Sequence, residues 1–169
     1  MNPDLFWIPG PWRGRLAVAT RPRGGDWLEE EAAGWRRAGL GLVVSLLEEE
    51  EAAELELAHE VDVAASNGIE FISFPIPDRG VPTSMPAVLS LLKRIVEALD
   101  EGKKVAVHCR QGIGRSGLIA AGVLKSSGIG TEREIEVVST ARGLTVPETP
   151  AQLQWIHHLP SEHLVVAPS

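Results

Sequence analysis

The stretch Val105–Gly117, VAVHCRQGIGRSG, decides how the rest of the chain is interpreted. Three apolar residues lead into His108 and Cys109, a glycine-bearing segment follows, and an apolar run begins directly after Ser116. This order predicts a strand, a tight loop and the N-terminus of a helix. The backbone N–H groups of such a loop can converge on one point, where the helix dipole adds positive potential. We therefore expect the loop to bind an oxyanion.

The side chains of this loop predict a nucleophile aimed at phosphorus. Cys109 lies at the exit of the strand, and the positive surroundings favour its thiolate form. Arg115 presents a planar fork that matches two phosphate oxygens. We expect Ser116 to donate a hydrogen bond to the sulfur. We expect His108 to lie under the loop, where it holds the backbone and favours the thiolate. The residues expected to bind the phosphate are those of the loop itself: Arg110, Gln111, Gly112, Ile113, Gly114 and Arg115.

A second segment, IPDRGVP at Ile76–Pro82, supplies a candidate general acid. Expulsion of an alkoxide or phenoxide from a phosphate monoester requires a proton for the leaving oxygen. Asp78 lies 31 positions before Cys109, on a loop flanked by proline and glycine. A loop one helix and one strand upstream can reach the mouth of the oxyanion site. We therefore expect Asp78 to act with Cys109.

Composition limits the class of protein. The 169 residues are 44% hydrophobic, enough for one ordinary domain over residues 1–169, with residues 1–25 as an N-terminal cap segment. The net charge of −7 argues against nucleic-acid or membrane partners. The single cysteine excludes an internal disulfide and a thiolate metal cluster. We expect no metal and no cofactor, because Arg115 and the loop amides neutralise the charge of the phosphate. A free nucleophilic thiol fits a reducing, cytoplasmic location.

Hydrophobic patterning predicts strands that alternate with helices. The uninterrupted apolar run at Leu40–Leu47 is typical of a strand buried on both faces. The other expected strands are Arg15–Thr20, Ile69–Phe74 and Lys103–His108. The expected helices are one capped by Asp26 and ending near Ala38, 50–66, one capped by Thr83 or Ser84, one over Leu118–Leu124, one capped by Thr131 with Glu134, and 151–158. This alternation predicts an α/β fold with a central, mostly parallel sheet flanked by helices.

Several polar residues receive ordinary structural interpretations. We expect the acidic run Glu48–Glu51 to complement the N-terminus of a helix on a solvated face. Arg79 and Arg142 are expected to be solvated surface charges. Arg110 and Gln111 are expected to point outward from the loop, where they bias the choice of substrate.

Three segments together resemble the cysteine-dependent protein tyrosine phosphatases and their dual-specificity group. HCRQGIGRSG resembles the family's phosphate-binding signature, and IPDRGVP resembles its mobile general-acid loop. PETPAQLQW at Pro147–Trp155 resembles the loop that positions the hydrolytic water, a role that the resemblance gives to Gln152. The family implies a phosphatase fold, a phosphocysteine intermediate, and phosphorylated proteins or peptides as substrates. It also implies that phosphate, sulfate or vanadate binds in the loop.

The chain departs from the classical tyrosine phosphatases at three points. Ile76 replaces the tryptophan of the acid loop, Glu148 replaces the water-positioning glutamine, and no tyrosine is present to stack on a phosphotyrosine ring. We therefore keep phosphoserine and phosphothreonine as candidate substrates beside phosphotyrosine. A phosphoinositide or small-molecule phosphomonoesterase, a phosphoprotein-binding module and a sulfurtransferase remain as alternatives.

Overall fold

A computed structural model describes residues 4–130 and 133–160. Its centre is a five-stranded sheet with the order β1-β2-β5-β3-β4. The strands are β1 (Leu5–Ile8), β2 (Arg15–Ala19), β3 (Leu40–Ser45), β4 (Glu70–Ser73) and β5 (Lys104–His108). All neighbouring pairs are parallel except β1 and β2, which run antiparallel. The predicted α/β fold with a mostly parallel sheet is confirmed.

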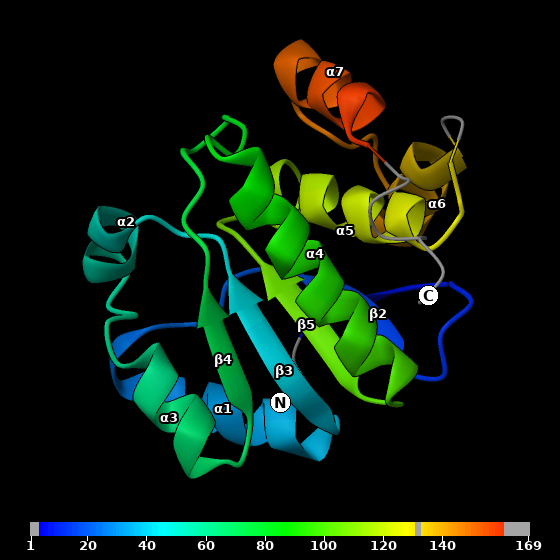
Figure 1. The fold of residues 1–169 in the computed structure, drawn as a ribbon. Coiled ribbons are helices and arrows are strands. Elements are labelled where there is room, and N and C mark those ends of the chain that lie inside the picture. The colour runs from blue at the N-terminus through cyan, green and yellow to red at the C-terminus, as the bar shows by residue number, and fades with distance from the viewer. Residues whose placement is uncertain (1–3, 131–132, 161–169) are drawn as a thin grey trace.

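Helices cover both faces of the sheet (Figure 1). In chain order they are the short 3-10 turn η1 (Gly25–Trp27), α1 (Leu28–Arg37), α2 (Glu49–Glu54), α3 (Glu60–Ser66), α4 (Met85–Asp100), α5 (Arg115–Ser126), α6 (Arg133–Arg142) and α7 (Pro150–His158). Trp35 of α1 and Ala64 of α3 pack on one face, against Val43 and Ala106. The face beneath α4 and α5 carries the larger core.

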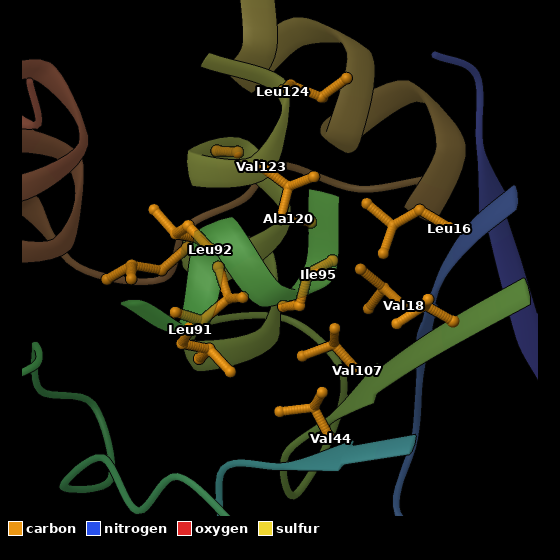
Figure 2. Packing of buried hydrophobic residues seen from close by; sticks show 14 of the residues in the cluster. Leu16, Val18, Val44, Leu91, Leu92, Ile95, Val107, Ala120, Val123 and Leu124 are labelled. Atoms are coloured by element: carbon orange, nitrogen blue, oxygen red, sulfur yellow. The ribbon is translucent and has the colours of Figure 1, made fainter. Parts of the chain in front are cut away.

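The larger core is built from apolar side chains of the central strands and of α4 and α5 (Figure 2). Val44 and Val107 lie opposite each other in the parallel pairing of β3 with β5. They pack with Leu92 and Ile95 of α4, both fully buried. Every residue of α5 except Lys125 is buried. The helix that follows the loop is therefore enclosed, and its N-terminus is held in a fixed position.

Two sequence expectations about elements are wrong. No strand was predicted over Leu5–Ile8, but this segment forms an antiparallel strand at the edge of the sheet. The helix expected over 50–66 is divided into α2 and α3, and between them Glu56 adopts a left-handed φ of 58°. The turn buries Leu57 against Leu28 and Leu47, and this packing competes with a continuous helix. Thr131, expected to cap α6, lies outside the described residues.

The helix caps agree in part with expectation. Ser84 caps α4 by accepting a hydrogen bond from the amide of Ala87 at 3.2 Å. Asp26 does not cap α1: it lies inside η1, and Trp27 occupies the N-cap position. Among the described residues, no helix is both long and apolar enough to cross a membrane.

The four parallel strands place the polar segments at one edge of the sheet. β3, β4 and β5 all run toward the edge where α2 lies (Figure 1). The segment after β3 leads into α2, the segment after β4 contains Asp78, and the segment after β5 contains Cys109. Ligand sites of parallel sheets form at this carboxyl edge.

Candidate active site

The loop after β5 carries the predicted nucleophile. Cys109 is only 3% exposed, and its Sγ lies 3.2 Å from Oγ of Ser116, the second residue of α5. The N-cap residue of α5 is Gly114, whose position offers no side-chain hydrogen bond to the first amides of the helix. Those amides are free to serve an anion. The distance of 3.2 Å between Sγ of Cys109 and Oγ of Ser116 matches the predicted contact between Ser116 and the sulfur.

Two glycines let the loop close tightly. Gly112 has a φ of 72°, in the left-handed region, and a Cβ there would lie 2.9 Å from the carbonyl oxygen of Ala19. A Cβ on Gly114 would collide with the carboxylate of Glu148. The first position requires glycine by conformation and by space, whereas a Cβ at the second would displace the Glu148 carboxylate.

Arg115 is fixed by a carboxylate that sequence reasoning placed on the surface. Nη1 donates to Oε1 of Glu51 at 2.6 Å, and Nη2 donates to Oε2 at 2.9 Å. Nη1 also donates to the carbonyl oxygen of Ile76 at 3.0 Å. Both residues are buried, at 2% and 8% exposure. The expectation of a solvated face for the whole acidic run is wrong at Glu51, because α2 turns this residue inward onto Arg115.

Charge and hydrogen bonding stabilise this pair in its ionised form. Burial alone raises the pKa of Glu51, but hydrogen bonds from Arg115 and the Glu48 amide, with the charges of Arg115 and Arg110, hold it below its usual value. Burial alone lowers the pKa of Arg115, but the Glu51 hydrogen bond and the charges of Cys109, Glu51 and Asp78 raise it. Arg115 therefore stays cationic beside the sulfur.

Asp78 reaches the same guanidinium from the acid loop. Its Oδ1 lies 3.3 Å from Nη2 of Arg115, and its side chain is 53% exposed. The next residue, Arg79, has a φ of 61°, so the chain turns sharply there. The sequence separated Asp78 and Arg115 by an entire helix and strand, and the fold brings them together as expected.

His108 lies beneath the loop, as predicted. Its Nδ1 is 3.4 Å from the carbonyl oxygen of Cys109. Its Nε2 is 2.5 Å from Oε2 of Glu60, the first residue of α3. Sequence reasoning did not identify Glu60. No motif marks it, because it is brought to His108 only by the packing of α3 against the sheet.

These elements enclose a cavity of about 230 Å³. Its walls combine the catalytic loop, the acid loop and the segment before α7, and the lining residues are Asp78, Arg79, Cys109, Arg110, Gln111, Ile113, Gly114, Arg115 and Glu148. Both Arg110 and Gln111 line the mouth. Gln111 is exposed, as its predicted outward direction requires, whereas Nη1 of the half-buried Arg110 lies 3.6 Å from Oε2 of Glu51. None of the lining residues is aromatic, so this part of the chain offers no ring to stack on a substrate.

Arg142 is not the solvated surface charge that was expected. Its Nε donates to the carbonyl oxygen of Gly112 at 2.8 Å, and its Nη2 donates to that of Gln111 at 3.0 Å. Its guanidinium also lies over the ring of Phe6 in β1, 4.1 Å from the centroid. By holding two carbonyl groups on the outside of the loop, Arg142 turns the opposite sides of those peptides inward. Arg79 is exposed, as expected, and lies 3.6 Å from Glu148.

Gln152 lies against the catalytic loop, with its side-chain amide next to Gly114. It is fully buried, and its Oε1 accepts hydrogen bonds from the amides of Glu148 and Thr149. Its Nε2 donates to the carbonyl oxygen of Gly80 at 3.0 Å. Both polar atoms are therefore engaged with backbone, and Glu148 lines the cavity instead. Gln152 joins the start of α7 to the acid loop.

One signal could have identified Glu51. Glu48 and Glu51 have the spacing of a capping box, in which the later side chain accepts from the earlier amide, here at 3.0 Å. A capping residue at the third position is held close to the helix axis, while Glu49 and Glu50 project away.

Among the described residues, no group of three or more His, Cys, Asp or Glu side chains is arranged to hold a metal ion.

Comparison with known proteins places this geometry in a family. The family model described as "Polymorphic toxin system, DSP-PTPase phosphatase" matches residues 18–129. The active form of the phosphatase Tk-PTP is 32% identical, with a TM-score of 0.77, over 96% of this chain and 99% of that one. Kinase-associated phosphatase, at 18% identity, shares the fold with a TM-score of 0.84 over 99% of both chains.

A curated relative matches over a shorter length. Cyclin-dependent kinase inhibitor 3 of Rattus norvegicus is 28% identical over 109 residues, which cover 63% of this chain and 51% of the relative. The chain thus spans about half the length of that protein. The family model covers the cysteine loop, the acid loop and Glu51, and the fold match extends over nearly the whole chain. This chain belongs to the cysteine-dependent dual-specificity and tyrosine phosphatases.

Proposed function

We propose that this chain hydrolyses phosphate monoesters on proteins or peptides, with phosphotyrosine, phosphothreonine and phosphoserine as the substrate class. The observation that carries the proposal is the convergence of Cys109, Arg115 and Asp78 on one small cavity. A thiolate, a fixed guanidinium and a movable carboxyl group are the three parts that the two-step reaction needs.

In the first step, the Cys109 thiolate attacks phosphorus and the bond to the leaving oxygen breaks. The carboxyl group of Asp78 gives its proton to that oxygen. Arg115 and the loop amides hold the equatorial oxygens, whose charge is dispersed in the transition state. Loop residues Arg110 to Gly114 contribute backbone donors, and Arg142 keeps two of those peptides in the required orientation. The products are the free alcohol or phenol and a phosphocysteine.

In the second step, water attacks the phosphocysteine. The Asp78 carboxylate accepts a proton from the water, the P–S bond breaks, and phosphate leaves as the thiolate is restored. Ser116, 3.2 Å from the sulfur, stabilises the departing thiolate by a hydrogen bond.

The second step also needs a side chain that lies next to the attacking water. Since both polar atoms of Gln152 bind backbone, we assign it a positioning role that acts through Gly80 of the acid loop. Glu148 lines the cavity beside the loop, and we place it next to the water. This assignment replaces the direct role that the family resemblance suggested for Gln152.

The cavity walls support a broad range of leaving groups. With no aromatic lining residue, recognition of phosphotyrosine gains nothing from ring stacking, and aliphatic phosphoesters are not penalised by comparison. The lone cysteine must stay reduced to act, which favours a reducing compartment such as the cytosol.

Parallel assays of matched phosphotyrosine, phosphothreonine and phosphoinositide substrates test the proposal. We expect turnover of both phosphopeptides within about a hundredfold of each other, and weaker turnover of the phosphoinositide. The Cys109→Ser variant is the control and should bind inorganic phosphate but turn nothing over. Preferred hydrolysis of the phosphoinositide would support the small-molecule alternative. Phosphopeptide binding without turnover by the unaltered chain would indicate a binding module.

A further inference from the structure

His108 and Glu60 form a buried pair directly beneath the nucleophile. Nε2 of His108 and Oε2 of Glu60 are 2.5 Å apart, and the two side chains are only 2% and 3% exposed. His108 ends β5, while Glu60 begins α3, 48 positions earlier in the chain. A carboxylate is removed from water at this depth only when a strong partner compensates it. The burial of both side chains therefore indicates a specific structural interaction and not a surface contact.

The hydrogen-bond partners of His108 define which of its nitrogens carry protons. Nδ1 faces the carbonyl oxygen of Cys109, which can only accept a hydrogen bond. Nε2 faces the Glu60 carboxylate, which in its ionised form also can only accept. With Glu60 ionised, both ring nitrogens are donors, and an imidazole with two N–H groups is a cation.

We propose that Glu60 is a positioning residue that holds His108 as a buried imidazolium beneath Cys109. The inference rests on the proposed function, because it assumes that Cys109 acts as a thiolate. Glu60 touches neither substrate nor sulfur, and it acts only through His108.

The orientation of the pair gives it two effects on the nucleophile. The Nδ1–H group fixes the carbonyl oxygen of Cys109 and with it the first peptide of the loop. The cationic ring lies between Cys109 and Glu60, so the positive end of the pair faces the cysteine. A positive charge beside the Cys109 peptide favours the thiolate. Arg115 supplies positive charge from α5, and the His108–Glu60 pair supplies it from the sheet.

The other charged groups around the pair do not offset this arrangement. From α2, Glu49 lines the same groove as Glu60, while Ser45 and Ser73 line it from β3 and β4 without charge. From α5, Arg115 approaches Cys109 with its own partner Glu51. On α3, His59 and Asp62 point to solvent, with side chains 83% and 75% exposed. Glu60 is thus the carboxylate that directly contacts His108.

A neutral pair gives the same positions of the heavy atoms and is the competing state. In that state Glu60 carries the proton as a carboxylic acid, and His108 carries a proton on Nδ1 alone. The hydrogen bond to Cys109 then survives, but the positive charge is absent. The two states differ in protonation, so the test must read protons and not positions.

Nitrogen NMR of the unaltered protein with 15N-labelled histidine reads the state directly. We expect the His108 ring to show two protonated nitrogens between pH 7 and pH 8, and assignment follows from the loss of its signals in His108→Asn. A ring with one protonated nitrogen in that range would overturn the proposal. This measurement needs no phosphatase turnover, so its outcome is independent of whether the proposed substrate is right.

Alkylation of Cys109 by iodoacetamide across a pH series tests the consequence. In Glu60→Gln the amide can keep a hydrogen bond to Nε2 without the charge, so the pH of half-maximal reactivity should rise by about one unit. Asp62→Asn is the matched control on the same helix and should leave that pH unchanged. In a His108→Asn background, Glu60→Gln should cause no further shift. An unchanged midpoint in folded Glu60→Gln would refute the proposal, and if that variant fails to fold the NMR result decides alone.

Discussion

Glu51 accepts hydrogen bonds from both terminal nitrogens of Arg115, at 2.6 and 2.9 Å, although it lies 64 positions earlier in the chain. The bidentate pair sets the plane of the guanidinium before any substrate arrives. Asp78 contacts the same guanidinium at 3.3 Å, so one cation orders both the anion site and the acid loop. Glu51 is therefore the residue through which the acidic segment after β3 takes part in the site.

Glu51→Gln should lower the free energy of unfolding by about 1–3 kcal/mol, because one donor of Arg115 then faces an amide instead of a carboxylate. The pKa of Glu51 is lowered in the folded state, so its stabilising effect is complete above its ordinary value of 4.5 and disappears as the pH falls through the lowered value. Urea unfolding at a series of pH values checks this. The difference between the two proteins should shrink below about pH 4.5, and a difference that grows there would contradict the assignment.

Arg142→Lys should weaken inhibition by vanadate about tenfold, since lysine keeps the charge but loses the fork that holds two carbonyl oxygens. A comparison of inhibition constants measures the effect, with Arg36→Lys on the far helix α1 as the control. If charge alone mattered, Arg142→Lys would behave like the unaltered protein.

Gly112→Ala should destabilise the protein by more than Gly68→Ala. Both glycines have a φ of 72°, and each substitution loses about 1–2 kcal/mol for the left-handed conformation. A Cβ at Gly68 meets nothing within 4 Å, whereas one at Gly112 meets the carbonyl oxygen of Ala19 at 2.9 Å. The midpoint temperature of thermal unfolding and the affinity for phosphate should both fall further in Gly112→Ala than in Gly68→Ala. Equal effects of the two variants would show that the close contact is relieved without cost.

Gln152→Leu and Glu148→Gln should affect different steps. Loss of the tether from Gln152 to Gly80 should slow formation of the phosphocysteine, most for substrates with poor leaving groups, as Asp78→Ala should. Loss of the Glu148 carboxylate should slow its hydrolysis, so that the intermediate accumulates. Rapid-mixing measurement of the product burst separates the two cases. A large burst in Gln152→Leu would restore the direct water-positioning role for Gln152.

The sequence was sufficient where local pattern and chemistry coincide. The strand, loop and helix around Cys109 were predicted because apolar runs, glycines and the nucleophile fall in one short segment. The pairing of Asp78 with that loop followed from its place after a parallel strand, since the carboxyl ends of such strands meet at one edge.

The sequence was insufficient where a side chain acts through tertiary packing. Glu51 and Glu60 both belong to the segment predicted as one helix over 50–66, and the turn at Glu56 divides it so that they reach Arg115 and His108. Arg142 lies at the end of a helix, where an exposed cation is the ordinary expectation. Its contact with the loop depends on how α6 packs against β1 and α5, which no local pattern encodes.

The central claim is that Cys109 carries the phosphoryl group between the two steps. Rapid acid quench of the protein with a phosphotyrosine peptide labelled on phosphorus, followed by peptide mapping, tests it directly. We expect label on the peptide that contains Cys109, and in greater amount in Glu148→Gln, with none in Cys109→Ser. Hydrolysis at full rate by Cys109→Ser, or label on any other residue, would contradict the account.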